Sequence, residues 1–169
     1  IAASLAFGSS GIDAPWQRFA AGDPLVRTIV LELRLPRALA AFGAGSVLAL
    51  AGVLMQALLR NPLADPYVLG VSGGAAVGAL AVMLAGLAGL AVDAGAVAGA
   101  FGAMLLVFAV AHGPGGWTTT RLLLTGVVVA AGCGAIVSLL LSLSDDLRLR
   151  GMVFWLLGDF GYVRTPWML

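Results

Sequence analysis

Long apolar runs alternate with short polar stretches along most of the chain. Four runs contain no Asp, Glu, Lys or Arg, and they cover residues 38–59, 67–92, 94–111 and 122–143. The first run has 22 residues. At a rise of 1.5 Å per residue, a helix of that length is about 33 Å long, enough to cross a hydrocarbon core of ~30 Å. The pattern therefore predicts four membrane-spanning helices.

Polar and helix-breaking residues mark the ends of these runs. Pro36 suits the first helical position of the first span, where its missing N–H is not needed. Asp93 marks the predicted turn between the second and third spans, and the glycines at 86–89 favour a break just before it. The other ends are predicted at residues 60–62, 112–116 and 144–146.

The segments outside the four runs contain shorter apolar patches. Residues 1–7 resemble the tail of a preceding span, and residues 152–157 are too short to span, which favours an interfacial or re-entrant helix. Within residues 8–37, a spacing of i, i+3, i+4 and i+7 predicts a short amphipathic helix. Its apolar positions are Val26, Ile29, Val30 and Leu33.

Small residues recur at four-residue spacing inside the runs. Three such ridges are Gly70/Gly74/Gly78, Gly95/Gly99/Ala103 and Gly126/Ala130/Gly134. In lipid, small residues let helix backbones approach closely, and that contact drives association. We therefore expect these spans to pack tightly, although general Gly and Ala enrichment explains part of the pattern.

Composition supports a membrane protein. Of the 169 residues, 61% are hydrophobic and 10% are charged, whereas a soluble domain has roughly 45–50% apolar and about 25% charged residues. This excludes a water-soluble enzyme or nucleic-acid binder and favours an all-α, polytopic membrane helical bundle. All nine basic residues are arginine. With one Cys (Cys133) and one His (His112), no metal cluster, cofactor or enzyme site is expected on this chain.

The arginines are distributed unequally between the two sides of the predicted bundle. Seven lie on the side that holds residues 8–37 and 144–169, and two lie on the other side. The positive-inside rule would place the first side in the cytoplasm. A loop that docks a protein partner can also carry arginines, so the count alone leaves the orientation open.

Several motifs, in order, resemble the FecCD-type permeases, the membrane subunits of ABC importers for iron–siderophore complexes, haem and cobalamin. They begin with Arg34-Leu-Pro-Arg37, followed by Met55-Gln-Ala57 at the end of a span. Next come Asn61-Pro-Leu-Ala-Asp-Pro66 and Leu69-Gly-Val-Ser-Gly-Gly-Ala75. Later segments, 120–126 and 154–161, extend the resemblance over roughly three quarters of the chain.

The resemblance implies a homodimeric permease of about ten spans in the cell inner (plasma) membrane. It would bind two ATPase subunits on the cytoplasmic side and receive substrate from a periplasmic or lipoprotein-anchored binding protein. The present chain, which starts without Met, would hold the second to fifth spans. Residues 8–37 and 144–169 would then be extracytoplasmic, against the arginine count, and the second segment would end at the start of a further span.

By the same resemblance, Arg34 and Arg37 are candidate docking points for acidic residues of the binding protein. Arginine stays charged and grips a carboxylate with two parallel N–H donors. The alternative is that these side chains only anchor a helix end to lipid headgroups.

A cytoplasmic gate is the second site implied, formed by Asn61, Leu63, Thr119 and Thr120. The side chains of Asn and Thr can form hydrogen bonds with one another or with water, and the Leu side chain can block the pathway. The alternative is that Asn61 ends one helix and Thr119 or Thr120 caps the next; both roles can hold together.

The span at 122–143 would line the pathway with its few polar atoms, those of Thr125, Ser138 and Ser142, unless these face neighbouring helices. Gln56 is expected to bond to a neighbouring helix, His112 to lie at the interface, and Cys133 to be packed.

Two other functions remain open. An ion-coupled secondary transporter usually places an ionisable group inside the membrane, and the four runs lack one. A non-transporting membrane scaffold would have neither an ATPase nor a binding-protein partner. The sequence does not separate siderophore, haem and cobalamin as substrates.

Overall fold

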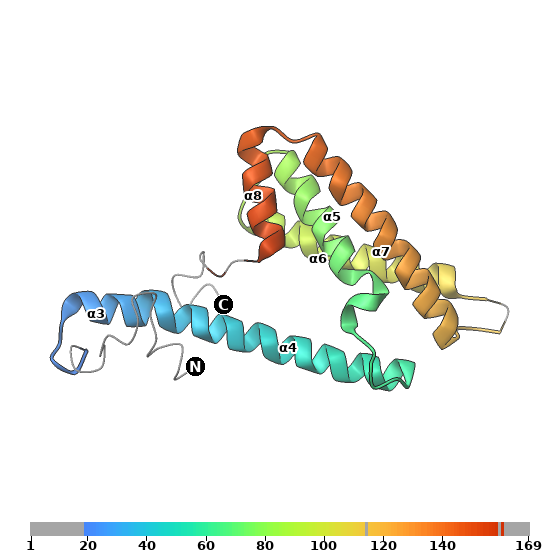
Figure 1. Ribbon diagram of the computed structural model, residues 1–169, viewed down its shortest axis with the longest axis horizontal. Coiled ribbons are helices and arrows are strands. Elements are labelled where there is room, and N and C mark those ends of the chain that lie inside the picture. The colour runs from blue at the N-terminus through green and yellow to red at the C-terminus, as the bar shows by residue number, and fades with distance from the viewer. Residues whose placement is uncertain (1–18, 114, 159, 161–169) are drawn as a thin grey trace. The chain divides into compact units, whose positions relative to one another are not determined.

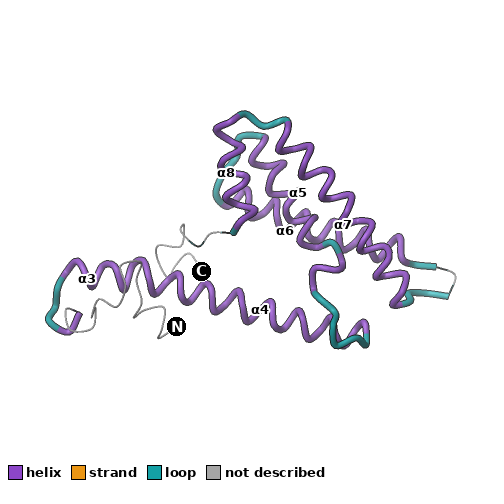
Figure 2. The backbone as a smooth tube through the Cα atoms, viewed as in Figure 1, coloured by secondary structure: helices purple, strands orange, loops and turns teal. Residues whose placement is uncertain are grey.

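The computed structural model describes residues 19–113, 115–158 and 160. Among them the regular elements are helices, apart from one isolated bridge between Gly113 and Gly116 (Figure 2). The predicted all-α class is therefore confirmed. In chain order the elements are α3 (Pro24–Thr28), η1 (Ile29–Arg34), α4 (Leu35–Leu59), η2 (Pro66–Leu69), α5 (Val71–Leu84), α6 (Leu90–Ala111), α7 (Thr119–Ser142) and α8 (Asp146–Leu157) (Figure 1).

Three helical segments of the described chain are long and apolar enough to cross a membrane: Pro24–Leu59, Leu90–Ala111 and Thr119–Ser142. The second predicted span, 67–92, contains α5, which has only 14 residues. Such a helix is about 21 Å long and falls short of a ~30 Å hydrocarbon core. The described helices thus support three spans by length, together with one shorter apolar helix.

Glycines explain why the run 67–92 is not one helix. Gly70, at φ +70°, separates the 3-10 turn η2 from α5, and Gly86 and Gly89 follow α5 with positive φ. The predicted break at 86–89 is therefore confirmed. The turn predicted at Asp93 is wrong, because Asp93 lies in the first turn of α6. A carboxylate is stabilised there by the partial positive charge of the helix N-terminus.

The chain divides into two units, residues 1–50 with 159–169 and residues 51–158. In the first unit a helix already begins at Pro24, where the Asp23 carboxylate accepts a hydrogen bond from the Leu25 N–H (3.1 Å). The predicted helix start at Pro36 is therefore wrong. Pro36 cannot donate to the carbonyl four residues back, and the wider π-helical turn η1 precedes it, with Leu35 N–H bonded to the Val30 carbonyl.

The predicted amphipathic helix around Val26–Leu33 is helical in the structure, but it continues directly into α4. Val30 is buried and Leu25 is exposed. The segment is thus the first part of a 36-residue helical stretch.

In the second unit, α5 lies between α6 and α7, and its glycines make the close approaches. A Cβ on Gly74 would meet the Gly99 carbonyl and Ala103, and one on Gly78 would meet the Gly95 carbonyl. On its other side, a Cβ on Gly73 would stand 2.8 Å from the Cβ of Cys133. These contacts confirm the tight packing that the small-residue ridges predict, and they also show Cys133 packed against α5.

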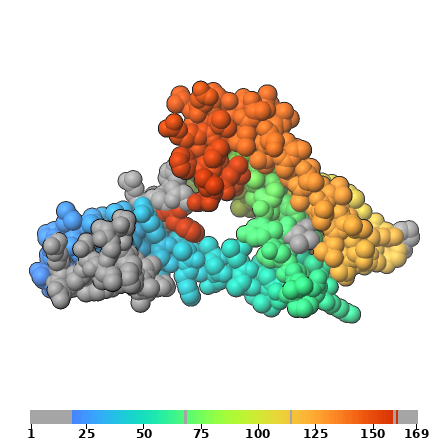
Figure 3. All heavy atoms as spheres, viewed as in Figure 1, coloured from blue at the N-terminus to red at the C-terminus, as the bar shows by residue number. Residues whose placement is uncertain are grey.

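Two apolar clusters lie at the two ends of this unit. One joins the end of α4 to η2, the end of α6 and the start of α7, with the buried residues Met55, Leu59, Leu69, Val107, Ala111 and Leu122. The other joins the end of α5 to the start of α6 and to α8, with the buried residues Ala79, Leu80, Val92 and Met152. Figure 3 shows the atoms of α7 and α8 as one continuous surface at this second end.

The short helix predicted at 152–157 is the second half of α8, which begins earlier, at Asp146. Asp145 explains the earlier start, because its carboxylate accepts a hydrogen bond from the Arg148 N–H (3.0 Å) and so caps the helix.

Candidate functional site

The candidate gate begins with the loop that follows α4. Helix α4 ends in a Schellman motif: Arg60 has a φ of +48°, and the N–H of Asn61 bonds to the Gln56 carbonyl (3.2 Å). The side-chain oxygen of Asn61 then accepts a hydrogen bond from the Leu63 N–H (2.9 Å). Asn61 therefore shapes the loop, and the Leu63 side chain projects from it with 88% of its surface exposed.

The other predicted gate residues open α7. The helix is capped by Thr118, whose hydroxyl accepts a hydrogen bond from the Arg121 N–H (3.3 Å). The alternative that Thr119 or Thr120 caps this helix is wrong, because both already lie inside its first turn. Thr118 has the extended backbone of a cap residue, and both following threonines are exposed. Their hydroxyls are thus not taken up by capping.

The core cluster at this end brings the two gate segments to the same end of the unit. Leu59 and Ala64 flank the Asn61–Leu63 loop, and Leu122 follows Thr120 by two residues. Leu59 and Leu122 are buried in this cluster, and Ala64 packs against it. The expected placement of both pairs at one end is therefore observed, while their closing of a pathway is a separate, functional prediction.

Sequence reasoning missed Trp117, which fixes the loop before α7. Its indole N–H donates to the Phe108 carbonyl (2.9 Å), and its ring packs edge-on against Phe108 and His112, with centroids 6.0 and 5.1 Å away. His112 is exposed. An aromatic residue beside a span end is typical of a membrane interface, and this was the available signal. The contacts tie the start of α7 to the end of α6.

The candidate docking arginines belong to the first unit. Arg34 ends η1 and is half-buried, and Arg37 lies in the first turn of α4 and is exposed. Residues three apart on a helix are neighbours on its surface. Arg34 and Arg37 therefore lie at neighbouring positions on the helix surface, and their docking role stays a prediction.

The three candidate lining residues do not form one stripe along α7. Ser138 and Ser142 are exposed and four residues apart, so they share a face, whereas Thr125 is half-buried and lies roughly 140° around the helix from Ser138. The Ser138 hydroxyl donates to the Gly134 carbonyl (3.0 Å) and that of Ser142 to the Leu139 carbonyl (2.8 Å). Both serines thus present mainly acceptor oxygens.

Gln56 is exposed on α4. At the other end of the unit, polar contacts join Ser144, Asp145 and Arg148 to neighbouring residues, and sequence reasoning did not assign them to a site.

Comparison with known proteins places this geometry in context. The sequence model of the FecCD transport family matches residues 1–168. The chain is 43% identical over 147 residues to the vitamin B12 import system permease protein BtuC of Salmonella paratyphi A, covering 83% of the chain and 44% of that relative. For BtuC of Citrobacter koseri the identity is 41% over 173 residues, covering 98% of the chain and 50% of the relative.

A solved structure also matches, that of a metal-chelate type ABC transporter in an inward-facing conformation. It superposes with a TM-score of 0.81 at 32% identity, covering 95% of this chain and 50% of that one. The chain thus spans about half the length of the curated relatives it matches.

Proposed function

Because the chain belongs to the FecCD transport family, and is a multi-pass protein of the cell inner (plasma) membrane, we propose that it forms half of the permease subunit of an ABC importer. The match to the family over residues 1–168 carries this proposal. The whole permease would act as a homodimer, powered by separate ATPase subunits and supplied by a substrate-binding protein.

The proposed substrate is a bulky metal chelate. Relatives at 41–43% identity are named as vitamin B12 permeases, and the matching structure is of a metal-chelate type transporter. Cobalamin is therefore the first substrate to test, with ferric siderophores and haem as alternatives. A wall that offers mainly hydroxyl oxygens, as at Ser138 and Ser142, suits passage of a large chelate without tight binding.

Uptake by proteoliposomes tests this function. The full-length permease, its ATPase and its binding protein are reconstituted, and accumulation of each chelate is measured with and without ATP. ATP-dependent accumulation of one chelate is expected. Accumulation driven by a proton or sodium gradient without ATP would instead identify a secondary transporter.

The positions of the charged residues favour transport powered by a separate ATPase over transport coupled to an ion gradient. The three long apolar helical segments contain six charged residues. Arg37, Asp93 and Arg121 lie in the first turns of α4, α6 and α7, and the other three lie before α4, namely Arg27, Glu32 and Arg34. Beyond its first turn, each of the described helices α4, α6 and α7 has no Asp, Glu, Lys or Arg of the kind that couples ion movement.

We further propose that residues 8–37 and 144–169 face the periplasm. Ser144 is a poor labelling site, because it is half-buried and its hydroxyl donates to the Leu140 carbonyl (2.7 Å), and Ser10 lies outside the described residues. Leu147 is 91% exposed, so Leu147→Cys is expected to react with a membrane-impermeant thiol reagent in intact cells. Gly115→Cys, at the other end, should react only after lysis; the reverse pattern would invert the orientation.

Arg34 and Arg37 are proposed to dock acidic residues of the binding protein. The Arg34→Glu/Arg37→Glu variant should bind that protein more weakly and with less dependence on salt, because pairing of charges at a rim acts mainly on association rate and is screened by ions. Binding is measured at low and high ionic strength. Arg27→Glu, on the same helical stretch, is the matched control. Unchanged affinity in the double variant would leave these arginines as lipid anchors.

A further inference from the structure

The C-terminal end of α5 has four carbonyls that the helix itself cannot pair. Three of them are bonded by the backbone that follows: Ala81 by the Ala85 N–H (3.0 Å), Met83 by the Gly86 N–H (3.0 Å) and Val82 by the Leu87 N–H (3.2 Å). Gly86, at φ +83°, makes this turn. The fourth carbonyl, that of Leu84, is reached by a side chain from a helix 64 residues later.

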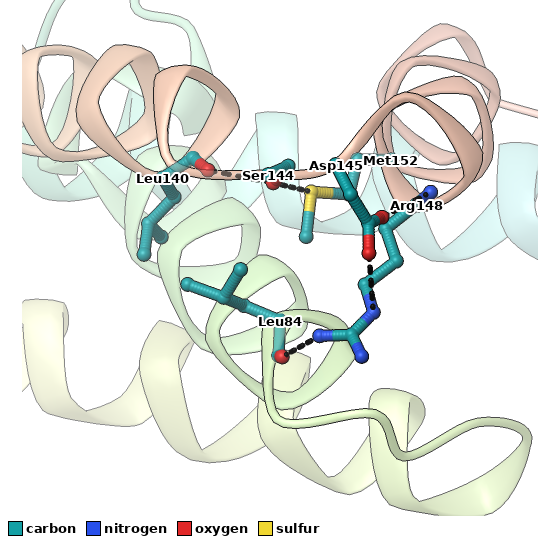
Figure 4. Close-up of polar contacts among 6 residues, drawn as sticks. All are labelled: Leu84, Leu140, Ser144, Asp145, Arg148 and Met152. Atoms are coloured by element: carbon teal, nitrogen blue, oxygen red, sulfur yellow. Dashed lines mark hydrogen bonds and ion pairs between the residues drawn. The ribbon is translucent and has the colours of Figure 1, made fainter.

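That side chain is Arg148, in the first turn of α8. Its guanidinium donates to the Leu84 carbonyl at 2.5 Å and lies 3.6 Å from the Asp145 carboxylate (Figure 4). The arginine thus joins the cap of its own helix to the end of α5. A hydrogen bond from a charged donor is stronger than a neutral one, and a cation is favoured at a helix C-terminus.

The surroundings make this contact more than a surface ion pair. The Arg148 and Asp145 side chains are 46% and 60% exposed, so their ion pair by itself would contribute little to stability, but it stands beside a buried apolar contact. Next to Arg148, Met152 is fully buried, and the Ser144 hydroxyl lies 3.0 Å from its sulfur (Figure 4). Arg148 and Met152 are one turn apart, so together they form the face of α8 that contacts α5 and α7.

We propose that Arg148 is a positioning residue that completes the C-terminal cap of α5 and thereby holds α8 in place on the helices α5–α7. Asp145 orients the guanidinium, and Met152 supplies the apolar part of the contact. The proposal does not depend on which substrate the permease carries.

Hydrogen exchange of the full-length permease in lipid nanodiscs tests it. In Arg148→Met, which keeps an apolar stem but removes the charged donors, amides of α8 and of the turn at 85–89 should both exchange severalfold faster. The amides in the middle of α6 should not change. Arg148→Lys, which keeps the charge and a donor, should restore protection in part at both places.

Arg150→Met is the matched control, because Arg150 is exposed on the same helix and lines a shallow groove with Asp146 and Phe154. It should leave both regions unchanged. Faster exchange in α8 alone, or no change at 85–89, would overturn the proposal. Faster exchange throughout α6 would also overturn it, because Arg148 would then serve general stability.

Discussion

Replacing Gly78 with alanine is expected to destabilise the second unit by about 1–3 kcal/mol, the usual cost of forcing extra atoms into a well-packed site. The added Cβ would collide with the Gly95 carbonyl and lie 3.1 Å from the Cα of Gly99. Both neighbours are backbone atoms, which cannot move away by changing a rotamer. The helices α5 and α6 would have to separate, and the close contacts that hold them in lipid would be lost.

Gly102→Ala is the matched control for this prediction. Gly102 lies in α6 like Gly95 and Gly99, but a Cβ there would meet nothing within 4 Å. Thermal melting of the full-length permease in one detergent compares the two variants. A lower midpoint for Gly78→Ala with an unchanged midpoint for Gly102→Ala is expected. Equal midpoints would show that the ridge is not what holds α5 to α6.

The small-residue ridges illustrate what sequence could predict. Spacing at four residues identifies one face of a helix, so Gly74 and Gly78 were correctly expected at a close helix contact. Spacing cannot identify the partner, because Gly126, Ala130 and Gly134 form an equally good ridge. In the structure Gly70 approaches Gly126 and Ala130, whereas Gly134 has open space around it.

Helix ends were predicted less well than helix interiors, for local reasons. In the sequence, Asp93 favours a turn because charge is excluded from the interior of a span, yet the first turn of a helix stabilises a carboxylate. Pro36 favours a helix start at that residue, yet a π-helical turn before it continues the helix. In both places, backbone hydrogen bonding decides the outcome, and composition alone does not report it.

The candidate gate was located by resemblance, and its local chemistry required the structure. Three consecutive threonines, residues 118–120, lie at the start of α7, and only their backbone geometry shows that Thr118 is the cap. The contact of Arg148 with Leu84 joins residues 64 positions apart, so no local pattern could have predicted it.

Replacing Leu63 and Thr120 with glycine should make the closed permease leak. If the gate buries Leu63, which is 88% exposed in this chain alone, its removal forfeits about 2 kcal/mol of apolar burial. A barrier lowered by that amount corresponds to roughly 30-fold faster leak. Release of substrate or a small dye from loaded proteoliposomes, without ATP, measures the effect. A fixed charge at this position would be costly to desolvate whenever the gate shut, which explains why amide, hydroxyl and branched apolar groups suit it.

Thr118→Ala separates gating from capping. It removes the cap of α7 and should cost roughly 1 kcal/mol of stability, but it leaves Leu63 and Thr120 in place, so folded permease should stay sealed. Leak in Leu63→Gly/Thr120→Gly without leak in Thr118→Ala would assign the closure to the exposed side chains. A sealed double variant with an earlier melt would mean that these residues only shape the loop and the helix end. Leak in all variants would instead point to the packing of Leu59, Ala64 and Leu122 beneath them, because that cluster supports both gate segments.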